Sequence, residues 1–113
     1  MLVNMARPLQ EPSFLILVSL AAAPQHGYGI ITDVESVSAG RVRLRAGTLY
    51  AALDRLRTDG LIEVDHEEVV ETRLRRYYRL TPDGLRRLAA ETSRLRHNAD
   101  VAAFRLRNAG GTA

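Results

Sequence analysis

The sequence contains no cysteine, no tryptophan and no lysine. Without cysteine, the chain can have no disulfide framework, no thiolate metal site and no cysteine nucleophile. This agrees with a reducing cytoplasm, where we expect the protein to act. The longest apolar run, FLILVSLAAA, is too short to span a bilayer, and no cleavable signal pattern is present. We therefore expect no contact with a membrane.

Features of enzymes and metal proteins are also scarce. The three histidines, His26, His66 and His97, do not have the spacing of a metal site, and the sequence has neither a nucleophile–base pattern nor a phosphate-binding glycine loop. We expect no catalysis, no cofactor and no bound metal. One alternative stays open: His97 with Glu91 or Asp100 could hold a metal, which would make the protein a metal-responsive sensor.

All 16 basic residues are arginine, and the net charge is +3. The planar guanidinium group suits phosphate oxygens and the edge of guanine. A genome rich in G and C would also favour arginine over lysine. Only the positions of the arginines therefore bear on function.

Hydrophobic periodicity predicts three short helices, a hairpin and a long final helix. The expected helices cover residues 12–23, 28–37, 47–59 and 82–107, the expected hairpin strands cover 61–67 and 75–80, and the alternating RVRLR (41–45) could add a short strand. Residues 1–10 are expected to be a flexible arm and 109–113 a disordered tail. This order predicts a mainly α fold with a small β-hairpin: a winged helix-turn-helix DNA-binding domain (11–81) and a long C-terminal dimerisation helix (82–108).

The third helix has the features of a helix that reads DNA. Leu49, Leu53 and Leu56 recur at helical spacing and are expected to face the core. Small residues at the leading end would let the helix backbone approach the major groove. The residues expected at DNA from this helix and the segment before it are Arg43, Arg45, Gly47, Thr48, Tyr50, Ala51 and Arg55. An ordinary amphipathic helix with a solvated arginine face is the alternative, and the element order favours DNA binding.

The second hairpin strand is strongly basic, whereas its partner strand is acidic. We expect Arg73 and Arg75, near the tip of this wing, to contact DNA. Arg76 and Arg79 should instead pair with the acidic strand, and the tyrosines at 77–78 should pack against the third helix or the core. A winged helix that contacts only protein remains an alternative to DNA binding.

Three segments, HGYGI (26–30), GTLYAALDRLRTDGLI (47–62) and RRYYRLTPDG (75–84), closely resemble the PadR family of transcriptional regulators in order and spacing. The resemblance covers roughly residues 12–88 and the short tail resembles the family's smaller subgroup. It implies a winged helix, a dimerising last helix and, usually, repression of a neighbouring promoter. It also implies that Tyr28 contacts the phosphate backbone.

The sequence departs from the family pattern at three points. Family members often have a proline where this chain has Ala51, and a glycine or proline in the wing loop, where this chain has VVET. Some members stack flat aromatic drugs between tryptophans at the dimer interface. A chain without tryptophan cannot bind them in that form.

The last helix carries apolar or small residues three and four positions apart, which is typical of a packing seam. The dimerisation residues expected there are Leu88, Leu95, Ala99, Ala102 and Leu106. A small apolar or aromatic effector could bind between the first and last helices, in a pocket lined by Phe14, Leu17, Val18, Leu95 and Phe104, although such residues are more often core. The resulting prediction is a homodimeric repressor that binds an inverted-repeat operator in double-stranded DNA and is relieved by a small-molecule effector.

Overall fold

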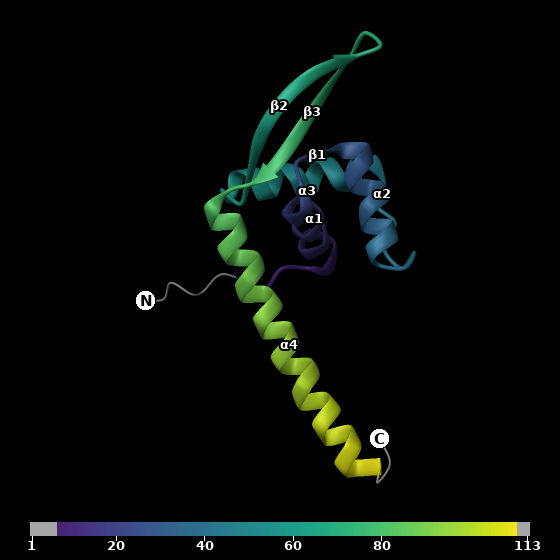
Figure 1. Cartoon of the computed structure of the whole chain (residues 1–113), viewed down its shortest axis with the longest axis vertical. Helices are drawn as coiled ribbons and strands as arrows, with labels where there is room; N and C mark the ends of the chain where they lie inside the picture. The colour runs from purple at the N-terminus through teal and green to yellow at the C-terminus, as the bar shows by residue number, and fades with distance from the viewer. Residues whose placement is uncertain (1–6, 111–113) are drawn as a thin grey trace.

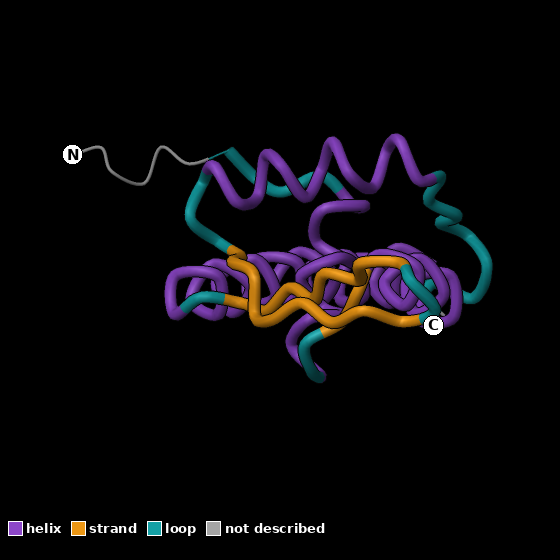
Figure 2. The backbone as a smooth tube through the Cα atoms, turned by 90° about the horizontal axis from the view of Figure 1, so that it is seen from above, coloured by secondary structure: helices purple, strands orange, loops and turns teal. Residues whose placement is uncertain are grey.

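The computed structural model describes residues 7–110 (Figure 1). The helices and strands are, in chain order, α1 (Glu11–Ala22), β1 (Gln25–His26), α2 (Gly27–Val37), α3 (Ala46–Thr58), β2 (Ile62–Val70), β3 (Arg73–Leu80) and α4 (Pro82–Gly110). The first three helices form a body from which the β2–β3 hairpin and α4 project in opposite directions (Figure 1). Seen from above, the strands lie in front of part of the helical body, and one helix lies clear of them to one side (Figure 2). The fold is the expected winged helix with a long C-terminal helix.

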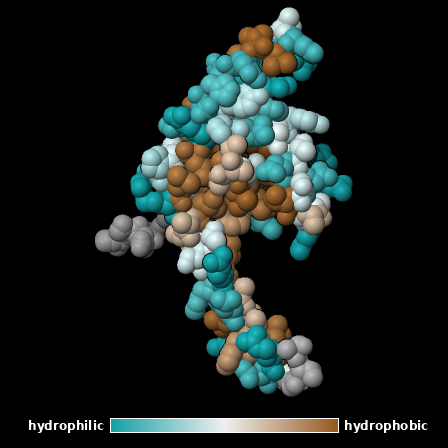
Figure 3. Space-filling model, viewed as in Figure 1, coloured by the Kyte–Doolittle hydropathy of each residue, from teal (hydrophilic) through white to brown (hydrophobic). Residues whose placement is uncertain are grey.

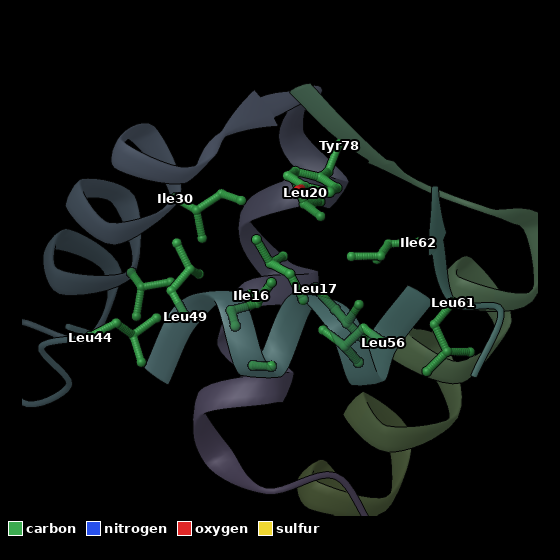
Figure 4. Close-up of a cluster of buried hydrophobic side chains, with 13 residues drawn as sticks. Ile16, Leu17, Leu20, Ile30, Leu44, Leu49, Leu56, Leu61, Ile62 and Tyr78 are labelled. Atoms are coloured by element: carbon green, nitrogen blue, oxygen red, sulfur yellow. The ribbon is translucent and has the colours of Figure 1, made fainter. Parts of the chain in front are cut away.

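The core is formed where α1, α2 and α3 meet beneath the sheet. Figure 4 shows the buried side chains of these helices pointing toward one another, with Tyr78 of β3 above them. The largest fully buried side chains are Ile16, Leu17, Ile30, Val34, Leu49 and Leu53. Each contributes about 1.5–3 kcal/mol by leaving water. The inward face predicted for the third helix is confirmed.

The sheet has three strands rather than two. β2 and β3 pair antiparallel from Ile62↔Leu80 to Val70↔Arg73, with a register shift between Val64 and His66. The short β1 pairs with the other edge of β3. This third strand was not predicted, and it fixes the base of the wing to the start of α2.

The strand considered for RVRLR is wrong, because residues 41–45 form no strand. Leu44 is buried and Val42 is half-buried, while Arg41, Arg43 and Arg45 are exposed. An extended segment lying on the core alternates in this way without pairing to a neighbour. The alternation was therefore a signal of burial and not of a sheet.

The ends of the wing and of α4 differ modestly from expectation. β2 continues to Val70, and the two-residue turn that follows places Glu71 and Thr72 at φ of 50° and 66°. Such turns need positive φ at both positions and usually contain glycine or asparagine. α4 reaches Gly110, into the predicted tail.

Residues 1–6 of the predicted N-terminal arm lie outside the described residues. Residues 111–113 of the predicted tail lie outside them as well. Within the arm, Leu9 packs against the core. No helix among residues 7–110 is both long and apolar enough to cross a membrane.

Candidate nucleic-acid interface

A concave surface lies between the wing, the start of α2 and one side of α3. Its lining residues are His26, Gly27, Tyr28, Tyr50, Asp54, Arg57, Val70, Glu71, Arg73, Leu74, Arg75, Arg76 and Tyr78. We call it the wing groove. Residues distant in sequence are brought together here because β1 joins the start of α2 to β3. Four of the predicted DNA-contacting residues border it: Tyr28, Tyr50, Arg73 and Arg75.

The head of α3 is open to solvent. Ala46, Gly47 and Thr48 are all exposed, and the N-cap residue Arg45 makes no capping hydrogen bond through its side chain. A Cβ added at Gly47 would meet no atom within 4 Å in the described part of the chain. The first amide groups of a helix have no partner within the helix, so they favour an anion from outside. Nothing inside residues 7–110 explains why position 47 is a glycine.

Two tyrosines border the wing groove beside this helix head. Tyr28 is 75% exposed and Tyr50 is 49% exposed. Tyr50 lies against the start of α2, where a Cβ added at Gly27 would be 2.4 Å from its hydroxyl oxygen. The glycine therefore lets the phenol pack there. Neither hydroxyl forms a hydrogen bond with another side chain among the described residues, so each could donate to a phosphate oxygen or a base edge.

The pairing predicted for Arg76 and Arg79 with the acidic strand is confirmed. Arg76 Nε lies 2.8 Å from a Glu67 oxygen, and Arg79 bridges Glu63 at 2.9 Å and Asp65 at 3.1 Å. These carboxylates raise the pKa of both guanidinium groups. By contrast, the guanidinium groups of Arg73 and Arg75 form no ion pair with any residue in 7–110. Neither guanidinium group is held by a carboxylate, although Asp54 and Glu71 also line the groove.

The two tyrosines at the end of β3 have different surroundings. Tyr78 is buried in the core, as expected. Tyr77 instead lies between two histidines, stacked on His66 at 4.3 Å and edge-on to His26 at 5.2 Å between ring centroids. Its hydroxyl donates to Glu68 at 2.8 Å. This stack connects β2, β3 and the start of α2.

Sequence reasoning assigned no structural role to the histidines of this stack. His26 Nδ1 accepts a hydrogen bond from Gly29 N at 3.2 Å and so caps α2. Burial and the nearby charge of Arg75 lower the pKa of His26, against a smaller opposing effect of Glu68. His66 lies 2.5 Å from Asp65, and this contact lowers the pKa of that carboxyl group. The sequence signal that could have indicated this cap is a histidine directly before GYG, the glycine-rich start of α2.

The other predicted DNA-contacting residues lie outside the wing groove. Arg43 and Arg45 are exposed just before α3, with Arg43 Nε 3.7 Å from a Glu35 oxygen. Thr48 and Ala51 are exposed on α3. Arg55 borders a different hollow, on the other flank of the helix.

Arg57 lines the wing groove although it was not among the predicted DNA contacts. Seven residues make almost two helical turns, so Arg57 falls on the same side of α3 as Tyr50. Asp54 shares this side and would repel phosphate. The sequence could not indicate which flank of α3 faces the wing, because that depends on where the hairpin packs.

Beyond its first three turns, α4 has little contact with its own body. It extends about 43 Å, for 29 residues at 1.5 Å each. Leu88 packs partly against the core of this chain, whereas Leu95, Phe104 and Leu106 are exposed. Hydrophobic side chains reach the surface along the projecting part of the helix in Figure 3. Ala99 and Ala102 are exposed on the same stretch.

The residues considered for an effector pocket are not equivalent. Leu17 has no exposed surface and belongs to the core, so it lines no pocket in this chain. Phe14 and Val18 are half-buried on α1. Leu95 and Phe104 are exposed on α4 and, in a single chain, have no surface opposite them within residues 7–110.

The acids considered as metal ligands are not gathered around His97. Glu91 is buried and bound by Arg94 at 2.5 Å, which lowers the pKa of the carboxyl group. His97 and Asp100 are exposed on α4. Residues 7–110 contain no group of three or more side chains that could hold a metal ion.

Three helices, a β-wing and an open head on the third helix define a winged helix protein. The sequence profile described as "Transcriptional regulator PadR-like family" matches residues 16–90, more than half of the chain. The protein belongs to this family. A 42-residue segment is 52% identical to "Transcriptional regulator Rv3488" of Mycobacterium tuberculosis. The match spans 37% of this chain and 38% of the length of that relative.

Solved structures share the fold. A PadR family transcription regulator from Clostridium difficile R20291 has a TM-score of 0.72 at 25% identity, over 86% of this chain and 99% of that one. A transcriptional regulator from Clostridium thermocellum has a TM-score of 0.70 at 26% identity, over 80% and 88%. Bacillus subtilis PadR, solved in complex with operator DNA, has a TM-score of 0.64 at 20% identity, over 72% and 47%, and supports the fold alone.

Proposed function

We propose that this protein is a sequence-specific DNA-binding transcriptional regulator. The observation that carries the proposal is the head of α3, where Gly47 is surrounded by open space and the helix amides have no side-chain cap. A helix that enters the major groove needs such a head. Membership of a family of transcriptional regulators supports this proposal, and one protein of the same fold was solved with operator DNA.

In the proposed complex, Thr48, Tyr50 and Ala51 lie in the major groove, and the wing follows the flanking backbone. Base edges specify the sequence, while phosphate contacts hold the register. Tyr28 and the unpaired Arg73 and Arg75 supply the phosphate contacts, together with Arg43 and Arg45 before α3. Arg57, which shares the wing groove, replaces Arg55 in this set.

We further propose that the protein acts as a homodimer. One winged helix reads only a half-site, so a two-fold dimer would read an inverted repeat. The exposed Leu95 and Leu106, with Ala99 and Ala102 between them, offer a seam on α4 for a second copy. Repression would then follow from occupancy of a promoter. An apolar effector between α1 and α4 of the dimer could release DNA only by binding a non-DNA-binding arrangement more tightly.

The test is a binding titration with the DNA upstream of the protein's own gene and a scrambled duplex of equal length, at two salt concentrations. We expect a preference for the native fragment that persists at the higher salt. Equal and salt-sensitive binding to both duplexes would contradict sequence reading at this promoter.

Variants locate the interface in the same assay. Tyr50→Ala should weaken binding to the native fragment, and Arg73→Ala should weaken binding to both duplexes and reduce the salt slope by about one. Arg96→Ala, at an exposed position on α4, is the matched control for loss of one positive charge. Sedimentation of every variant should report the same dimer. Unchanged affinity in Tyr50→Ala and Arg73→Ala would remove the wing groove from the interface.

A further inference from the structure

A second hollow lies at the far end of α3, away from the wing groove. Its lining residues are Arg7, Pro8, Leu9, Gln10, Ser13, Arg55, Leu56, Asp59 and Arg87. It is thus formed by the segment before α1, the first turn of α1, the last turn of α3 and α4. We call it the basal hollow. The proposed reading surface makes no use of it.

The basal hollow is rich in positive charge. Three arginines line it, and Asp59 is the single carboxylate among the lining residues. The guanidinium group of Arg87 donates to the carbonyl of Arg7, which holds this side chain across the hollow. Arg55 forms no ion pair with any residue of the described chain. The hollow therefore has an excess of fixed positive charge.

One nearby carboxylate does not cancel this excess. Glu91 lies close enough for Arg87 to contribute to its lowered pKa, but Arg94 is the main cause. Arg94 holds Glu91 through two contacts, at 2.5 and 3.3 Å. A carboxylate engaged in this way leaves Arg87 able to accept a further anion.

The first turn of α1 presents unused donors to the same hollow. The N-cap Gln10 makes no capping hydrogen bond through its side chain. Ser13 is 9% exposed, and its hydroxyl forms no hydrogen bond with another residue of the range 7–110. The hydroxyl borders the hollow, so it is placed to donate to a ligand there. Helix amides and a hydroxyl beside arginines make an environment suited to phosphate.

We propose that the basal hollow binds a phosphate group. Arg55 and Arg87 would hold its oxygens, and the hydroxyl and backbone amide of Ser13 would donate to it from the first turn of α1. The phosphate could belong to a small molecule or to the DNA backbone. The second source rests on the proposed function, since a backbone strand would reach the flank of α3 opposite Tyr50.

The first arm of the test uses inorganic phosphate and full-length protein. Thermal unfolding is followed with increasing phosphate, and sodium chloride keeps the ionic strength constant. We expect a saturable rise in Tm for the wild type, because a ligand of the folded state stabilises it. Arg55→Gln and Ser13→Ala should lose this rise. Arg96→Gln, on α4 outside the hollow, should keep it.

The second arm measures the salt dependence of DNA binding. A lost phosphate contact lowers the slope of log K against log salt by about 0.9. If the slope falls in Arg55→Gln but not in Arg96→Gln, the phosphate comes from DNA. A Tm rise without a slope change assigns the hollow to a small molecule. The absence of both effects overturns the proposal, whereas a failure of DNA binding itself overturns the proposed function and leaves the first arm intact.

Discussion

The starts of α4 and α3 each have a glycine and a threonine, yet they are built in opposite ways. At α4, the Thr81 hydroxyl accepts from Gly84 N at 3.0 Å and donates to the Gly60 carbonyl at 2.6 Å. A Cβ added at Gly84 would lie 2.0 Å from the Leu61 carbonyl oxygen. At α3, no side chain of the N-cap residue bonds the helix amides, and Gly47 faces open space.

This difference separates residues that serve the fold from residues left for a partner. Around Thr81, donors and acceptors are satisfied within the chain, and Gly84 is needed because backbone passes directly over it. The amides at the head of α3 must find a partner outside the helix, which is water in the free protein. The same residue types thus stabilise the fold at the start of α4 and, on our proposal, contact a partner at the start of α3.

The largest effect is expected for Gly84→Ala. The new methyl group would overlap the rigid backbone of Leu61, and neither α4 nor the loop can move without breaking the Thr81 cap. We expect a loss of about 3 kcal/mol in the free energy of unfolding, the upper part of the range for overpacked sites. This would lower Tm by roughly 10 °C or more.

Denaturant and thermal unfolding at a fixed protein concentration would measure the loss. Gly47→Ala is the matched control, since the same methyl group enters open space there. Equal stability of the two variants would show that α4 does not pack on Leu61 as described.

A smaller loss is expected for Thr81→Ala. The variant removes the cap of α4 and the bond to the Gly60 carbonyl, and losing a helix cap costs about 1 kcal/mol. Thr81→Ser keeps the hydroxyl and should retain most of the stability. Chemical unfolding of both variants checks this. If serine destabilises as much as alanine, the methyl group of Thr81 and not its hydroxyl is what matters.

Gly47→Ala should stabilise the protein, in contrast to the two variants above. Alanine is favoured over glycine in a helix, so the free energy of unfolding should rise by up to about 0.5 kcal/mol. On the proposed function, the added methyl group would hinder close approach to the major groove. Operator affinity should fall by about tenfold, equivalent to 1.4 kcal/mol. A titration alongside an unfolding curve tests both, and a variant that gains stability without losing affinity would leave the head of α3 outside the interface.

Sequence patterns predicted the parts of this comparison that depend on local chemistry. TPDG contains the cap residue and the proline of the first turn, and the leucines of α3 mark its buried face. The pairing of Arg76 and Arg79 followed from opposite charges on neighbouring strands. These features were predictable because each depends on residues close in sequence or in register.

The remaining features depend on tertiary packing. β1 has two residues, too few for any periodicity, and forms because β3 has a free edge beside it. The choice between Arg55 and Arg57 depends on which flank of α3 the wing covers. The sequence also could not show which of the two glycines, in HGYG and in AGTL, would be covered by another side chain. Only the position of Tyr50 shows that Gly27 is covered while Gly47 is open.

The start of α2 is an intermediate case, since its cap is a group that can titrate. Neutral His26 accepts from Gly29 N, but the protonated ring has no acceptor and would place positive charge at a helix N-terminus. Burial and Arg75 lower its pKa below the ordinary value of 6.5. The unfolded chain therefore binds the proton more readily, and the stabilisation is complete above pH 6.5 and lost as the pH falls through the lower folded pKa.

His26→Asn isolates this contribution, because asparagine caps helices well and does not titrate. Unfolding free energies of both proteins are measured from pH 7.5 to 4.5, and their difference is followed. Wild type should lose more stability than the variant over the acidic part of this range. The carboxyl groups of Asp65 and Glu91, whose pKa values are also lowered, titrate in both proteins and cancel in the difference. Parallel curves would mean that the α2 cap does not depend on the neutral ring, and that the start of α2 is as insensitive to acid as the threonine-capped start of α4.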